Sequence, residues 1–65
     1  MPKEYNVDQI RLLATQRMLT QRLKKGDFIP VGKDSLLQLE QILRDANIDF
    51  STLPYAYDIY LITIY

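Results

Sequence analysis

The amino-acid sequence predicts an α+β fold built in the order helix, short extended segment, helix and long C-terminal β-strand. Two stretches have the apolar spacing and the end signals of helices, and the last eleven residues are rich in β-branched and aromatic side chains. The chain has 65 residues, which is the length of one small domain, so we expect residues 1–65 to form a single domain.

The first helix is predicted over residues 7–25. Asn6 precedes it as an N-cap, and Gln9 stands three residues later, where its side chain completes a capping box. Gly26 follows the predicted end and suits the left-handed backbone conformation that commonly follows a helix. The start and end signals therefore agree on one continuous helix.

The second helix is predicted over residues 36–46. Ser35 and Gln38 have the spacing of a second capping box, and Asn47 is suited to the left-handed position after the helix. The apolar side chains form one stripe, as in a helix that lies on a single core. That stripe contains Leu36, Leu39, Ile42, Leu43 and Ala46.

Extended structure is predicted in two places. Residues 28–31 are apolar but contain Pro30, which has no backbone donor, so they form an edge strand or an extended connector. Residues 49–54 are interpreted as a loop, and residues 55–65 as one long strand. The two extended pieces pair either in parallel through a helical crossover or in antiparallel fashion, and both arrangements fit the sequence.

The predicted first helix has two apolar stripes, and a helix of this kind normally packs against two surfaces. One stripe contains Val7, Ile10, Ala14 and Met18, and the other contains Leu12, Leu19 and Leu23. The second stripe is therefore expected to face a partner. The alternative is a single stripe that wraps further around the helix, with Leu13 as the bridge.

The predicted strand over residues 55–65 is apolar on both of its alternating faces, as in strands that are buried on both sides. Its candidate neighbour within the chain is the short segment 28–31. Most of its backbone donors and acceptors would then lack partners, and such an edge tends to pair with another chain. We therefore expect pairing between two copies in a homodimer. The alternative is a segment that is shorter or partly helical.

The side chains that support most catalytic and metal sites are missing. The chain contains no Cys and no His, which excludes thiolate and imidazole chemistry. The eight acidic residues form no motif with the spacing of a calcium or magnesium site. We expect no enzyme activity, no metal and no cofactor.

The net charge of zero is the sum of two opposite halves. Residues 1–33 hold seven basic and three acidic residues, and residues 34–65 hold one basic and five acidic residues. The halves therefore carry +4 and −4. The basic end of the first helix is a candidate phosphate-binding surface, although a solvated basic flank is the commoner explanation of such a pattern. Its side chains are Arg17, Arg22, Lys24 and Lys25.

No stretch of the sequence approaches the length of a membrane span. The longest apolar run, residues 59–62, is far shorter than the roughly 20 residues required. The first five residues lack the apolar run of a secretory signal. We therefore expect a cytoplasmic protein without a membrane partner.

These observations predict a small non-catalytic interaction module: a regulator, inhibitor or adaptor that forms a homodimer and docks on a larger protein. The alternative is a small nucleic-acid-binding regulator that uses the basic end of the first helix. The residues expected to contact a protein partner are Leu12, Leu19, Leu23, Tyr57, Ile59, Tyr60, Leu61, Ile62 and Ile64.

Overall fold

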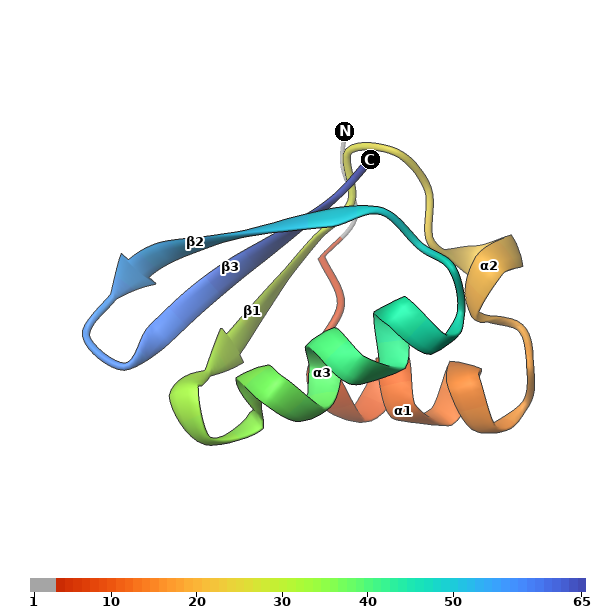
Figure 1. Ribbon diagram of the computed structural model, residues 1–65, viewed down its shortest axis with the longest axis horizontal. Helices are drawn as coiled ribbons and strands as arrows, with labels where there is room; N and C mark the ends of the chain where they lie inside the picture. The colour runs from red at the N-terminus through yellow and green to blue at the C-terminus, as the bar shows by residue number, and fades with distance from the viewer. Residues whose placement is uncertain (1–3) are drawn as a thin grey trace.

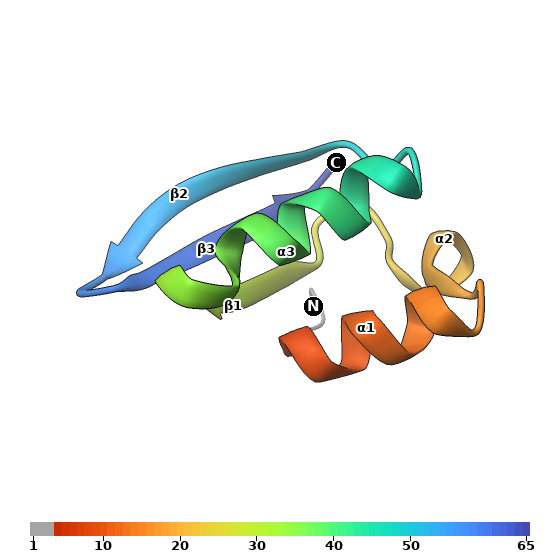
Figure 2. The same cartoon turned by 60° about the horizontal axis from the view of Figure 1, so that its bottom comes forward.

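The fold is a two-layer α+β arrangement, seen in a computed structural model that describes residues 4–65. Helices α1 and α3 lie against one face of a three-stranded antiparallel sheet whose strand order is β1-β3-β2 (Figure 1). Figure 2 shows the same layers after a rotation of 60°. The α+β class is confirmed. The elements are α1 (Val7–Thr15), α2 (Leu19–Arg22), β1 (Phe28–Gly32), α3 (Lys33–Asp45), β2 (Phe50–Ala56) and β3 (Ile59–Ile64).

The prediction of one continuous helix over residues 7–25 is wrong, because the backbone turns between α1 and α2. Arg17 adopts a left-handed conformation with φ of 58°. The N–H of Arg17 donates to the carbonyl of Ala14 at 3.1 Å, and the N–H of Met18 donates to that of Leu13 at 2.8 Å. This pair of hydrogen bonds is a Schellman motif, and it satisfies carbonyls that the end of α1 leaves free.

Because the chain turns between α1 and α2, two leucines that were predicted to face a partner pack into the core of the same chain. Leu19 and Leu23 are 3% and 7% exposed and share one apolar cluster with Ile10. Burying a leucine contributes about 1.5–3 kcal/mol, whereas a left-handed residue other than glycine costs about 1–2 kcal/mol. Burial of both leucines therefore outweighs the conformation of Arg17. The interpretation of α1 as a helix with two separate apolar faces is accordingly wrong.

Local signals at the start of α1 and the end of α3 are confirmed. The Asn6 side chain accepts from the backbone of Gln9 at 2.8 Å, and the Asn6 backbone donates to the Gln9 side chain at 3.0 Å. Asn47 is left-handed with φ of 59°. The N–H of Ile48 reaches the carbonyl of Leu43 at 3.0 Å, which closes a second Schellman motif.

Helix α3 begins three residues earlier than predicted, so the capping box of Ser35 and Gln38 is wrong and both residues lie inside the helix. Gly32 occupies the N-cap position and has no side chain with which to cap. The backbone of another element helps instead: the N–H of Lys33 donates to the carbonyl of Asp58 at 2.9 Å. The start of α3 is therefore tied to the turn between β2 and β3.

The C-terminal part of the chain is a β-hairpin, so the predicted loop over residues 49–54 and the single strand over residues 55–65 are both wrong. A two-residue turn at Tyr57 and Asp58 separates β2 from β3, and Asp58 adopts φ of 56°. Strand β3 lies in the middle of the sheet and pairs on both sides within the chain. The expectation of pairing between chains through this strand therefore loses its basis.

Strand β1 is an edge strand, as Pro30 predicts, and the antiparallel alternative is the one observed. Its alternate residues point toward the helices, as do those of β3. The single stripe of α3 is confirmed, since all of its members belong to the core or pack against it. The buried core contains Ile10, Leu19, Leu23, Ile29, Val31, Leu39, Leu43, Ile62 and Ile64.

Candidate functional site

The face of the sheet turned away from the helices is the main candidate surface. Side chains alternate across a strand, and Ile29, Val31, Ile62 and Ile64 occupy the buried side. The intervening residues therefore point outward, where Figure 1 shows no helix of residues 4–65. We call this surface the open face. Its side chains are Phe28, Pro30, Ser51, Leu53, Tyr55, Ile59, Leu61, Thr63 and Tyr65.

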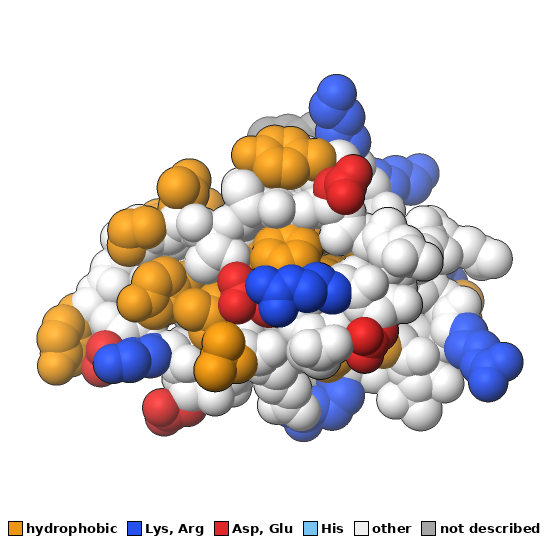
Figure 3. All heavy atoms as spheres, in the orientation of Figure 1, with side chains coloured by type: hydrophobic (Ala, Val, Ile, Leu, Met, Phe, Trp, Pro, Cys, Tyr) orange, Lys and Arg blue, Asp and Glu red, His pale blue; other side chains and the backbone are white. Residues whose placement is uncertain are grey.

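The open face is apolar and carries no charged strand residue. Leu53, Tyr55 and Tyr65 keep 57%, 69% and 64% of their surface in contact with solvent. The Tyr65 hydroxyl donates to the Ser51 hydroxyl at 2.9 Å, so one of the polar groups at this end is already satisfied. Figure 3 shows hydrophobic side chains gathered over the hairpin, on the left of the view.

A shallow hollow of about 400 Å³ lies on the open face. Its walls come from all three strands, with Glu4 at the rim, and the other lining residues are Phe28, Pro30, Tyr55 and Leu61. Tyr55 and Pro30 lie on the two outer strands, so the hollow extends across the width of the sheet. The face is therefore a continuous apolar surface with a depression, and not a set of scattered side chains.

Each of the two outer strands contains a proline whose backbone nitrogen points to the free edge of the sheet, away from β3. Tyr65 donates its N–H to the carbonyl of Asp49 at 3.0 Å. Asp49 therefore faces β3. Because the hydrogen-bonding direction alternates from one residue to the next along an antiparallel pair, Pro54 faces the free side of β2. A proline there removes an outward donor, which hinders pairing of this edge with another strand.

The other edge follows the same logic. Ile64 donates its N–H to the carbonyl of Asp27 at 2.9 Å, so residue 27 faces β3. The carbonyl of Phe28 faces outward and accepts from the N–H of Tyr5 at 3.2 Å. Pro30, two residues further, also faces outward. The N-terminal segment and Pro30 therefore block the free side of β1.

The structure divides the predicted protein-contact residues into two groups. Leu19, Leu23, Ile62 and Ile64 are buried in the core and at most 7% exposed, so their side chains offer almost no surface to a protein partner. The remaining five are exposed or half-buried, namely Leu12, Tyr57, Ile59, Tyr60 and Leu61. Two of these, Ile59 and Leu61, belong to the open face. Leu12 lies on α1, and Tyr57 lies in the hairpin turn.

Sequence reasoning missed several residues of the open face. Leu53 was missed because residues 49–54 were interpreted as a loop, and Phe28 and Tyr65 were not predicted as contacts although they lay in predicted extended segments. One signal was available: Asp58 is the single charge in the run 55–65. A turn placed there would have given two short strands with alternating residues.

The predicted nucleic-acid contacts Arg17, Arg22, Lys24 and Lys25 are all exposed. Within residues 4–65 none of them takes part in a salt bridge. Arg17 lines a groove beside α3, whereas Arg22 lines a hollow beside Tyr5 and α1. Arg17 and Arg22 therefore belong to different surfaces of the molecule. Lys3, which the sequence count placed in the basic half, lies outside the described residues.

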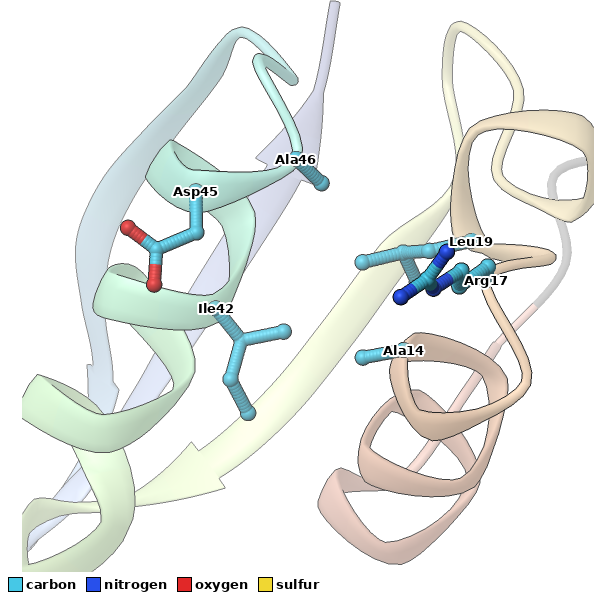
Figure 4. Close-up of a pocket in the computed structure, with 6 residues that line it drawn as sticks. All are labelled: Ala14, Arg17, Leu19, Ile42, Asp45 and Ala46. Carbon is cyan, nitrogen blue, oxygen red and sulfur yellow. The ribbon is translucent and has the colours of Figure 1, made fainter.

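A second hollow, the helix groove, separates the α1–α2 junction from the end of α3 (Figure 4). Its volume is about 320 Å³. Four apolar side chains and two charged residues line it: Ala14, Leu19, Ile42, Ala46, Arg17 and Asp45. In Figure 4 the side chains of Ile42 and Ala46 point into the gap from α3, and Leu19 and Arg17 approach it from the other wall.

Acidic groups are dispersed in the described part of the chain, where no group of three or more potential metal-binding side chains occurs. Asp27 is the buried exception, at 4% exposure, and its carboxylate accepts from the N–H of Lys24 at 2.8 Å. This contact closes the turn between α2 and β1. Asp27 therefore stabilises this turn.

Comparisons of the chain with protein-family models, with curated proteins and with solved structures found no match. Among residues 4–65, no helix combines the length and apolarity that crossing a membrane requires. The functional interpretation therefore depends on the surfaces described above.

Proposed function

We propose that the protein is a small non-catalytic interaction module that works by self-association and by docking on a partner protein. The observation that carries this proposal is the open face, an apolar sheet surface that no helix of residues 4–65 covers. Contiguous exposed apolar patches on small proteins typically mark interaction sites. The open face replaces the strand edge as the proposed contact, because Pro30 and Pro54 blunt both edges.

A second copy is the first occupant to test. Packing of two open faces brings together uncharged strand residues only, so it places no like charges of the strands opposite each other. A twofold axis makes the same patch serve both copies. The chain has no net charge, so long-range repulsion between copies is absent. Two sheets packed face to face also form a common layer arrangement, with a spacing of about 10 Å.

The size of the molecule favours such an arrangement. A chain of 65 residues buries only roughly 60% of its unfolded surface, and this one has no cysteine with which to form a disulfide. Burial of Leu53, Tyr55 and Tyr65 between two copies adds apolar contact that the isolated chain lacks. The dimer is therefore expected to be more resistant to denaturant at high protein concentration than at low concentration.

The test is light scattering on gel-filtered protein over a range of micromolar concentrations. We expect a mass near twice 7.7 kDa that falls on dilution. Leu53→Lys places a charge in the open face and should return the protein to a monomer. Leu37→Lys is the matched control, because Leu37 is 77% exposed on α3 and lies outside the open face.

Two results would contradict self-association. One is a monomer at every concentration, and the other is an equal effect of the two lysine substitutions. A monomeric protein that loses capture of a purified partner through Leu53→Lys, and keeps it with Leu37→Lys, would support docking on a larger protein instead. Retention of capture by both variants would reject the open face as the contact.

The second candidate function is nucleic-acid binding by the basic end around α2. The observation in its favour is the run of residues 17–25, which contains four exposed basic side chains and no acidic one. Figure 3 shows basic side chains projecting at this end of the molecule, on the right of the view. Affinity should fall steeply with salt, with roughly three or four phosphate contacts in the slope. Absence of DNA or RNA retardation at low salt would reject this candidate.

A further inference from the structure

The helix groove has features that the proposed interaction through the open face does not use. It lies between helices, and Arg17, which lines it, holds a left-handed conformation. Since the groove is formed by helices and the open face by strands, a ligand in the groove would be independent of self-association.

The apolar side chains that line the helix groove are suited to contact with an aliphatic ligand. Leu19 and Ile42 face each other from the two sides, and Ala14 and Ala46 leave room between them (Figure 4). The volume of about 320 Å³ is at the lower end of small-molecule pockets. A cavity of about 150 Å³ already accepts benzene. The groove is therefore large enough for a medium-length hydrocarbon chain.

The orientation of the two charged side chains that line the helix groove, Arg17 and Asp45, favours a negatively charged ligand. Arg17 extends from the α1–α2 junction toward the gap (Figure 4) and forms no salt bridge within residues 4–65. Asp45 also lines the groove, but its carboxylate points away from the gap and accepts from the Gln41 side chain at 2.8 Å. The guanidinium is thus the charge that faces an incoming ligand, and its planar donors match a carboxylate.

We propose that the helix groove binds a small aliphatic carboxylate, with its hydrocarbon chain against Ala14, Ile42 and Ala46 and its carboxylate on the Arg17 guanidinium. Binding requires no change in the fold, since the walls are already in place. The apolar walls supply most of the affinity through burial, and the guanidinium supplies selectivity for the anion over a neutral molecule of the same length.

The test is a titration of isotope-labelled protein with octanoate, followed by amide NMR shifts at constant pH and ionic strength. We expect saturable shifts that are largest for the amides of the groove-lining residues. Octanol has the same chain without the charge and should bind about five-fold more weakly, which is the size expected for a partly exposed ion pair. Arg17→Gln should weaken octanoate binding by the same factor of about five and leave octanol binding unchanged.

Two further variants separate the parts of the proposal. Arg22→Gln is the matched control, because Arg22 is also exposed and basic but lines a different hollow. It should leave octanoate binding unchanged. Ala46→Leu fills the groove and should abolish binding of both molecules. If that variant fails to fold, the comparison of octanoate with octanol on the unaltered protein still tests whether the groove prefers the carboxylate.

Three results would overturn the inference. The first is the absence of saturable shifts at millimolar octanoate. The second is equal affinity for octanol and octanoate, or equal losses from Arg17→Gln and Arg22→Gln. The third is a set of shifts centred on Leu53 and Leu61, which would place the ligand on the open face instead. None of these results depends on whether the protein forms a dimer.

Discussion

Substitution of Arg17 by glycine and, separately, by alanine tests the break between α1 and α2. Both variants lack the arginine side chain, so the difference between their stabilities reports the backbone. At φ of 58° a residue with a Cβ atom costs about 1–2 kcal/mol, and the greater freedom of glycine in the unfolded chain offsets about 0.5–1 kcal/mol of its advantage. We expect Arg17→Gly to be more stable than Arg17→Ala by about 0.5–1 kcal/mol.

A continuous helix through this position would reverse the sign. In a helix interior glycine is about 1 kcal/mol less favourable than alanine. The matched control is the same pair of substitutions at Leu12, which lies inside α1 and is exposed. There we expect the glycine variant to be the less stable one. The two positions are only five residues apart, so opposite signs would locate the break between them.

The measurement is urea denaturation followed by far-ultraviolet circular dichroism, with the slope of free energy against urea compared among the variants. All variants are measured at one low protein concentration, so that self-association contributes equally. For a domain of this size, 1 kcal/mol corresponds to a shift of about 4–8 °C in Tm. If Arg17→Gly is less stable than Arg17→Ala by the margin seen at Leu12, the reasoning about the Schellman motif is refuted.

Three other substitutions have defined costs in the same denaturation experiment. Asn6→Ala removes the capping box and should cost about 1 kcal/mol; no loss would mean that α1 does not need its cap. Asp27→Ala removes the charged acceptor of the Lys24 N–H from a part-buried hydrogen bond and should cost about 1–3 kcal/mol, whereas Asp49→Ala at an exposed position should change stability by less than about 0.5 kcal/mol. Leu39→Ala empties a fully buried position and should cost about 2–5 kcal/mol, enough to unfold much of the protein, and full retention of structure would contradict the core assignment.

The parts of the fold that the sequence predicted correctly depend on near neighbours in the chain. Asn6 caps α1 through a residue three positions away, and Asn47 ends α3 through hydrogen bonds to the preceding turn. Pro30 marks an edge strand because it has no N–H, whatever its neighbours are. Signals of this range can be read directly from a sequence.

The parts that failed depend on contacts between distant residues. Arg17 has no intrinsic preference for the left-handed region, and its conformation follows from the burial of Leu19 and Leu23 against the rest of the core. Strand β2 contains Ser51 and Pro54, two residue types common in loops, and it becomes a strand through its pairing with β3. Periodicity along one segment cannot reveal either effect.

The same limit applies to the candidate site. Ile59 and Leu61 were predicted as contacts because they lie in an apolar run, and they do belong to the open face. Ile62 and Ile64 were predicted for the same reason but point to the helices. Only the layer arrangement, with helices on one side of the sheet, separates the two sets.

The central position of β3 also determines when the sheet can form. Among the described elements β3 is the last along the chain, yet both strand pairings require it. During synthesis β1 and β2 therefore remain without a neighbouring strand until residues 59–64 have left the ribosome. A nascent chain that ends before Ile59 can form helices but no part of the sheet. Emergence of β3 thus allows β1 and β2 to join one ordered layer.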